Sequence, residues 1–283
     1  MGRGAGAERD ADVSAVPATV AWLADPAHWR GTDGIVTRLA EHLALSGTAL
    51  TIAALLALPA GMWLGHAGRG ALVVINVLNV GRALPSLAIL AFALPVAFRL
   101  GLGLGFWPTV LMLVPLGVPL ILINCYVAIR SVDREVVDVA WGMGMRGWEV
   151  FQEVELPLAA PIILGGARNA AVTIVATATL GALVASGGLG RYIVDGLARQ
   201  ETGRLVAGAV LVALLSIATE AAFDILERLA VPPAVRAARH ADEIRLPGVA
   251  ARRELGPLSA YVDEGGRGPA LVERRRQKGE SGG

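Results

Sequence analysis

Few side chains in this sequence have the type and spacing needed for catalysis or metal binding. The histidines are scattered, without cysteine or carboxylate partners at ligand spacing; they are His28, His42, His66 and His240. We interpret them as interface or loop residues, and we expect no metal site and no catalytic residue. The single cysteine, Cys125, lies in an apolar run and is expected to pack as a small hydrophobic side chain.

Binding of nucleotide phosphates is not expected either. The only lysine, Lys278, is followed by Gly279 near the C-terminus, so the sequence contains no G-x-x-x-x-G-K-[ST] loop. The glycine-rich stretch Ser186–Gly190 follows an apolar run instead of a short strand, which argues against a phosphate loop. We therefore expect no cofactor, and the energy for any active process has to come from a partner.

The most informative pattern lies in residues 132–157, an amphipathic segment between two apolar runs. Apolar residues recur at roughly helical spacing in its first half, where glycines flank Met143. Trp148, Phe151 and Val154 then recur at every third position, with glutamates opposite. Glycine permits the positive φ that ends one helix and begins another, so we predict two short helices joined at the glycines. Because the second helix is acidic, the pattern favours contact with a protein over contact with anionic lipid.

The composition indicates where this segment resides. Of the 283 residues, 54% are hydrophobic and 17% are charged, whereas soluble domains contain about 25% charged residues. Between Leu43 and Ile129 the only charged side chains are Arg69, Arg82 and Arg99. This apolar stretch predicts an integral membrane protein. The net charge of +1 provides no basic field, so we expect no nucleic-acid partner.

We predict an all-α integral membrane protein with five transmembrane helices, or six if the second apolar run splits. A spanning helix needs about 20 apolar residues. Five runs satisfy this, and they cover residues 43–65, 71–98, 106–129, 156–186 and 205–229. Pro85 cannot donate a backbone hydrogen bond, so a break is expected near Ala83–Ser86. In the fourth run, Arg168 is expected to extend toward the membrane interface.

The arginines predict the orientation, because cytoplasmic loops are enriched in them. Arg130, Arg134 and Arg146 follow the third run, so we place residues 132–157 in the cytoplasm. We predict three parts: an N-terminal extramembrane segment (1–42), a transmembrane domain (43–230) and a disordered cytoplasmic tail (231–283) that lacks an apolar period. Five spans put the N-terminus outside, and six put it inside.

The amphipathic segment resembles the E-A-A-x3-G-x9-I-x-L-P signature of binding-protein-dependent ABC importer permeases. Every spacing agrees, although Asp, Val and Val stand where the signature has Glu, Ala and Ile. The matching residues are Asp138, Val139, Ala140, Gly144, Val154, Leu156 and Pro157. Other stretches, Asn79–Ser86 and Gly187–Gly190 among them, resemble the osmoprotectant (glycine betaine/carnitine/choline) branch, and the resemblance covers roughly residues 43–230.

This resemblance implies a transport subunit, not an enzyme, that crosses a bacterial cytoplasmic membrane several times and contacts its lipid. A separate ATP-binding subunit would hydrolyse ATP, and an extracytoplasmic substrate-binding protein would deliver the solute. A second permease copy or a paralogue would complete the translocation path. Residues 132–157 would form the coupling-helix pair, in which Asp138 meets polar or basic groups. Trp148 and Phe151 would fill apolar space on the ATP-binding subunit, and Gly144 would set the angle between the helices.

Two non-helical signals at membrane depth predict the path itself, because such backbone is tolerated only beside protein or water. They comprise Asn79, Pro85, Ser86, Gly187, Gly188 and Gly190. Backbone carbonyls and small side chains would suit a compact zwitterion or quaternary amine. Other interpretations of the sequence stay open. The path positions could serve only to kink helices or to let them pack closely. The substrate could be an amino acid or a sulfonate, or the protein could be a passive channel or a membrane scaffold.

Overall fold

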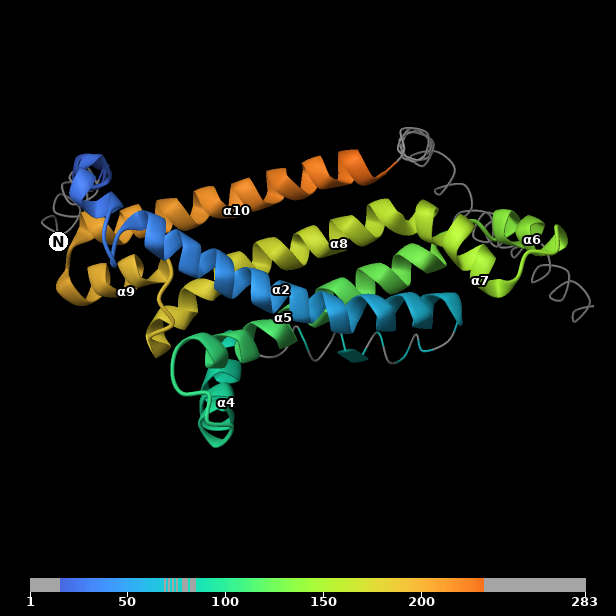
Figure 1. Ribbon diagram of the computed structural model, residues 1–283, viewed down its shortest axis with the longest axis horizontal. Coiled ribbons are helices and arrows are strands. Elements are labelled where there is room, and N and C mark those ends of the chain that lie inside the picture. Colours follow the sequence, from blue (N-terminus) through green and yellow to red (C-terminus); the bar gives the residue numbers. More distant parts are fainter. Residues whose placement is uncertain are drawn as a thin grey trace, which may run out of the picture. The chain divides into compact units, whose positions relative to one another are not determined.

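The structure is a computed structural model that describes residues 16–68, 70, 72, 74, 76, 77, 81 and 85–231. These residues form helices and no strands, in agreement with the predicted all-α class (Figure 1). The long helices are α2 (Ile35–His66), α5 (Phe106–Arg130), α8 (Leu156–Thr177) and α10 (Thr202–Ala230). The shorter elements are the 3-10 helix η1 (Pro26–Trp29), α4 (Ser86–Arg99), α6 (Arg134–Gly142), α7 (Gly147–Glu149), the π-helical turn η2 (Val150–Glu155), the 3-10 helix η3 (Ala178–Val184) and α9 (Gly190–Arg199).

Helices α2 and α5 run parallel and in close contact. A β-carbon added at Gly61 would lie 2.7 Å from the Cβ of Cys125, and one added at Gly65 would lie 2.8 Å from the Cβ of Ile129. The two glycines therefore let α5 approach the backbone of α2, as small residues do between membrane helices. Because successive contacts advance in the same direction along both helices, the chain between them has to return to the end at which α2 begins.

This return fits five spans and not six, because two crossings between α2 and α5 would make these helices antiparallel. The predicted break in the second run is confirmed at Pro85, which has extended backbone (φ −65°, ψ 129°) and precedes α4. With 14 residues, α4 is about 21 Å long, shorter than the ~30 Å apolar layer of a bilayer. By itself, helix α4 is therefore too short to cross a bilayer. In the described part, four helical stretches are long and apolar enough to span a membrane: 35–66, 106–130, 147–184 and 202–230.

Helix α8 runs antiparallel to α5 and is joined to α10 by ion pairs. A β-carbon at Gly166 of α8 would lie 2.2 Å from the Cβ of Asn124 of α5, so these helices also touch through a glycine. Arg168 lies 3.4 Å from Asp224 and 3.7 Å from Glu227 of α10. The sequence prediction named no partner for Arg168, and the structure supplies two carboxylates of α10.

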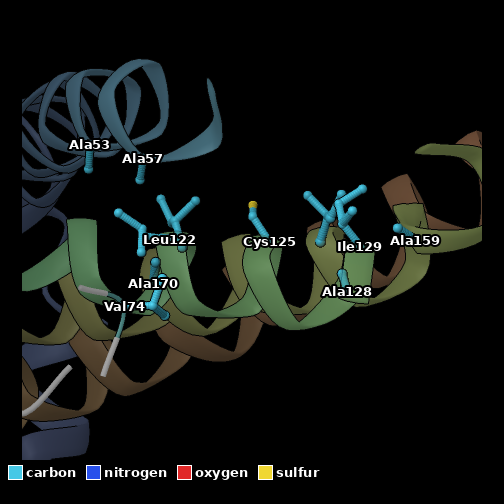
Figure 2. Close-up of a cluster of buried hydrophobic side chains, with 11 residues drawn as sticks. Ala53, Ala57, Val74, Leu122, Cys125, Ala128, Ile129, Ala159 and Ala170 are labelled. Carbon is cyan, nitrogen blue, oxygen red and sulfur yellow. The ribbon is translucent and has the colours of Figure 1, made fainter. Parts of the chain in front are cut away.

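The core between α2, α5 and α8 consists of small and branched apolar side chains. Figure 2 shows Ala53 and Ala57 of α2 above Leu122 and Cys125 of α5. Cys125 is completely buried in this cluster, which confirms that it packs as a small hydrophobic residue. Alanine, glycine and cysteine keep the helix axes close, so packing is tight without large side chains.

The long helices present different structures at their two ends. Helices α6 and α7 lie at one end and α9 lies at the other, and we call these the α6 end and the α9 end (Figure 1). Helix α2 begins at the α9 end at Ile35, earlier than the predicted start at Leu43. Residues 16–24 are also helical and contact the start of α10, where a β-carbon at Gly203 would lie 2.9 Å from the carbonyl oxygen of Ala18. The predicted tail beyond Val231 lies outside the described residues.

Candidate functional site

The predicted joint at Gly144 is present in the 132–157 segment. Asp133 caps α6, where its carboxylate accepts a hydrogen bond of 2.9 Å from the backbone N–H of Glu135. After α6 ends, Gly144 adopts φ +84°, a conformation that favours glycine. Its backbone N–H donates to the carbonyl of Trp141 at 3.0 Å, which closes the helix end. Positive φ at Gly144 therefore turns the chain from α6 into α7.

The second predicted helix does not end where expected. Helix α7, the π-helical turn η2 and α8 follow one another without a break from Gly147 to Thr177. Within η2 the wider hydrogen-bond pattern appears as a bond from the backbone N–H of Leu156 to the carbonyl of Phe151. Leu156 and Pro157 thus lie inside a continuous helix and do not separate a short helix from a span. The 132–157 segment is one short helix, α6, folded back on an extension of α8.

Large apolar side chains remain exposed on this segment. Val139 is 61% exposed, Met143 70% and Trp148 64%. We call the exposed set the α6 patch, and it comprises Val136, Val139, Trp141, Met143 and Trp148. Asp138 and Gly144 are exposed beside it, whereas Ala140 is buried. Exposed apolar side chains gathered on one short segment are typical of sites of interaction with another protein or with a membrane.

The remaining predicted coupling residues are less exposed. Phe151 and Val154 are partly buried, as are Leu156 and Pro157. The ring of Phe151 stacks on that of Trp148, with the centroids 5.5 Å apart, and meets the ring of His66 edge-on at 5.4 Å. The structure therefore brings the predicted coupling residues together, but it divides them into an exposed group and a supporting group.

One feature of this region was not predicted from the sequence. His66, the last residue of α2, donates from Nδ1 to Oε2 of Glu155 at 2.5 Å, and the Glu155 side chain is 10% exposed. A cavity of about 210 Å³ lies beside this pair and is also lined by Arg130 and Asp138. The pattern of histidines did not indicate this partner, because the carboxylate that lies against His66 is 89 positions away.

The predicted path residues fall in two places. Pro85 and Ser86 begin α4, whereas Gly187 and Gly188 form the turn before α9, with φ values of +77° and +71°. Gly190 begins α9, where a β-carbon would lie 2.3 Å from the carbonyl oxygen of Thr179. Asn79 lies outside the described residues. Bends at Pro85 and at the paired glycines are thus present.

The turn at Gly187 and Gly188 is held by a charged group on α2 that the sequence did not single out. The backbone N–H of Gly188 donates to Oε2 of Glu41 at 2.8 Å, and Nη1 of Arg38 donates to the same oxygen at 2.8 Å. At the next position of α2, Nε2 of the fully buried His42 lies 2.9 Å from the carbonyl oxygen of Val175. His42 is therefore a structural core residue and not an interface residue.

A larger cavity opens at the α9 end. It has a volume of about 740 Å³, and both acidic and basic side chains line it together with Trp22 and Tyr192. Tyr192 donates its hydroxyl to the carbonyl of Asp33 at 2.6 Å, and the guanidinium of Arg204 lies over its ring. Burial raises the pKa of Tyr192 to about 12. The polar lining fits a water-exposed position outside the apolar layer.

Together, the apolar helices and the amphipathic 132–157 segment between two of them define a multi-pass membrane protein with a short extramembrane helical segment. The chain belongs to the family described as binding-protein-dependent transport system inner membrane component, which residues 57–231 match. It is thus the permease subunit of an ABC importer, located in the bacterial cytoplasmic membrane. An ATP-binding subunit, on which ATP is hydrolysed, and a substrate-binding protein are its partners.

Several relatives are permeases named for transport of glycine betaine, carnitine or choline. The chain is 36% identical over 198 residues to the glycine betaine/carnitine/choline transport system permease protein OpuCB of Bacillus subtilis, a match that covers 70% of this chain and 89% of that protein. It is 37% identical over 192 residues to the choline transport system permease protein OpuBB of the same organism, and this match covers 68% of this chain and 86% of that protein. The carnitine transport permease protein OpuCB of Listeria monocytogenes is 35% identical over 203 residues, and this match covers 72% of this chain and 91% of that protein.

A solved structure shares the fold. An inward-facing form of the MetNI methionine ABC transporter aligns with a TM-score of 0.61 and 21% identity, over 70% of this chain and 96% of that chain. At that identity the likeness concerns the fold alone. The predicted family and the all-α membrane fold are therefore both confirmed.

Proposed function

We propose that this permease imports a compact osmoprotectant such as glycine betaine, choline or carnitine. The observation that carries the proposal is the identity of 35–37% to permeases named for these solutes, over most of their length. The fold of a methionine transporter is also similar, but at 21% identity it gives no reason to prefer an amino acid. Sulfonate import and passive conduction are competing functions, and uptake measurements distinguish both of them from osmoprotectant import.

We further propose that the 132–157 segment docks on the ATP-binding subunit. The α6 patch offers exposed apolar side chains, and Asp138 offers a charge at its edge. Trp148 extends from the patch and is backed by Phe151, so its ring is held in place while one face stays accessible. Aromatic anchors of this kind carry much of the binding energy in protein interfaces. Gly144 sets the angle at which α6 meets the ATP-binding subunit.

The opposite end then faces the substrate-binding protein. With the 132–157 segment in the cytoplasm, the α9 end and its charged cavity lie on the extracytoplasmic side of the membrane, together with residues 16–34. A second permease copy or a paralogue would complete the path, with bends at Pro85 and at Gly187 and Gly188 moving during gating. Asn79, Ser86 and Gly190 would lie beside these bends. Residues 231–283 would be a cytoplasmic tail that transport does not require.

Uptake by a reconstituted transporter tests the proposal. The permease, its ATP-binding subunit and its own substrate-binding protein are placed in liposomes, with ATP inside and radiolabelled solute outside. We expect uptake of at least one of glycine betaine, choline and carnitine, and none without ATP. Uptake of methionine or a sulfonate, with all three osmoprotectants ignored, would overturn the substrate assignment. Uptake without ATP would show a passive channel.

A further inference from the structure

The buried pair of His66 and Glu155 joins the first long helix to the base of the 132–157 segment. His66 is the last residue of α2, and Glu155 is the last residue of the π-helical turn η2. Their atoms Nδ1 and Oε2 lie 2.5 Å apart, and the Glu155 side chain is only 10% exposed. A carboxylate in such a position is expensive to leave without a partner, because water no longer solvates it. The pair therefore binds α2 firmly to this part of the chain.

Aromatic contacts reinforce the same joint. The ring of Phe151 meets the ring of His66 edge-on and stacks on Trp148, which belongs to the α6 patch. A β-carbon added at Gly147 would lie 3.3 Å from the ring of Trp141, another member of the patch. These contacts connect the patch to His66 through packed rings, and to Glu155 through the helical turn on which Phe151 and Glu155 both lie.

The other end of α2 is fixed to a second moving part of the proposed mechanism. There, Glu41 accepts a hydrogen bond from the backbone of Gly188, in the turn proposed to bend during gating. Between Glu41 and His66, α2 is helical throughout and is held against α5 by Gly61 and Gly65. Helix α2 therefore has a polar attachment at each end, one to the base of the 132–157 segment and one to the turn before α9.

From this arrangement we infer that Glu155 and His66 are positioning residues that transmit movement of the 132–157 segment along α2 to the turn at Gly188. This inference rests on the proposed docking of that segment on the ATP-binding subunit. The wide turn of η2 places Glu155 against His66, and π-helical turns within α-helices are frequent at functional sites. Loss of the pair should uncouple ATP hydrolysis from transport without weakening the docking.

The test compares Glu155→Ala with Glu153→Ala in the full transporter. Glu153 lies on the same π-helical turn but is exposed, so its removal is a matched control. Glu155→Ala leaves His66 partly accessible to water, so neither partner remains buried and charged. We expect Glu155→Ala to retain the ATP-binding subunit and ATP hydrolysis, and to lower solute uptake per ATP hydrolysed by about tenfold or more, in the range of site-to-site coupling. The exchanged pair His66→Glu/Glu155→His should restore much of this ratio.

The outcomes separate this inference from the proposed function. Unchanged uptake per ATP in Glu155→Ala, or an equal loss in Glu153→Ala, overturns the inference. Loss of the ATP-binding subunit from Glu155→Ala also overturns it, because the pair would then serve docking. The proposed docking fails by itself if α6 patch variants still bind the ATP-binding subunit. The ratio is measured with whichever solute the unmodified transporter imports, so a wrong substrate assignment does not affect it.

A cross-link gives a second, independent measurement if Glu155→Ala fails to fold. His66→Cys and Glu155→Cys are combined in a Cys125→Ala background and joined by a short bis-methanethiosulfonate reagent. Because the two positions are inferred to move as one body, the joined transporter should keep its uptake, whereas the unjoined double variant should lose it. Loss of uptake on joining would show that the contact has to open during the cycle, and the inference would be wrong.

Discussion

Replacement of Gly144 by valine should weaken binding of the ATP-binding subunit without unfolding the permease. Gly144 has φ +84°, and no atom lies within 4 Å of an added β-carbon, so the effect comes from the backbone and not from a clash. Holding a β-branched residue in this region costs about 1–3 kcal/mol. If α6 relaxes to avoid that strain, the docked geometry has to be restored on binding. At 1.4 kcal/mol per factor of ten, the affinity should fall by about 5- to 150-fold.

Gly142 provides the matched control. It is also exposed and also has no atom within 4 Å of an added β-carbon, but it lies in α6 and does not have a positive φ. Gly142→Val should therefore keep most of the affinity. The assay is titration of the detergent-solubilised permease with the purified ATP-binding subunit, together with thermal unfolding of the permease alone. Equal losses in the two variants, or unchanged affinity in Gly144→Val, would refute the reasoning.

Three further predictions follow from single contacts. Gly187→Ala should lower the melting temperature, because Gly187 has φ +77° and an added β-carbon would lie 2.3 Å from Oε2 of Glu41. The control Gly165→Ala lies on an open face of α8 and should leave the melting temperature unchanged, so equal shifts in the two variants would contradict this prediction. Tyr192→Phe should cost about 1 kcal/mol by removing the hydrogen bond to Asp33. Burial raises the pKa of Tyr192 to about 12, so the unfolded chain loses the phenol proton at a lower pH than the folded protein. The stability difference between the unmodified protein and Tyr192→Phe should therefore be largest below pH 10 and fade as the pH rises to about 12. A pH-independent difference in urea unfolding would contradict this prediction. Truncation after Val231 should leave uptake intact, and a loss at normal membrane level would show that the tail is needed.

Patterns that are local in sequence predicted much of the fold. The apolar run at 106–129 corresponds to α5, observed at Phe106–Arg130, because a membrane helix must be apolar along its whole length. Gly144 was predicted to turn the chain because a glycine between two amphipathic stretches is a local signal. Pro85 likewise marks the observed start of α4. Each of these features depends on residues within a few positions of one another.

Contacts between distant residues were missed for the opposite reason. His66 and Glu155 are separated by 89 positions, and in the sequence Glu155 looks like one more glutamate on a polar helix face. Glu41 and Gly188 are separated by 147 positions. Pro157 was interpreted as a helix boundary, but it lies inside a continuous helix, directly after the π-helical turn η2. Only the folded arrangement brings α2 against η2 near one end and against the turn before α9 near the other.

Photocross-linking tests the central claim most directly. A photoreactive amino acid is placed at Val139, in the α6 patch, or at Leu197 of α9, which is similarly exposed at the opposite end. Irradiation of the assembled transporter in membranes should join the Val139 position to the ATP-binding subunit and should not join the Leu197 position to it. Absence of the adduct at Val139, or an adduct with the ATP-binding subunit from Leu197, would contradict the proposed docking and orientation.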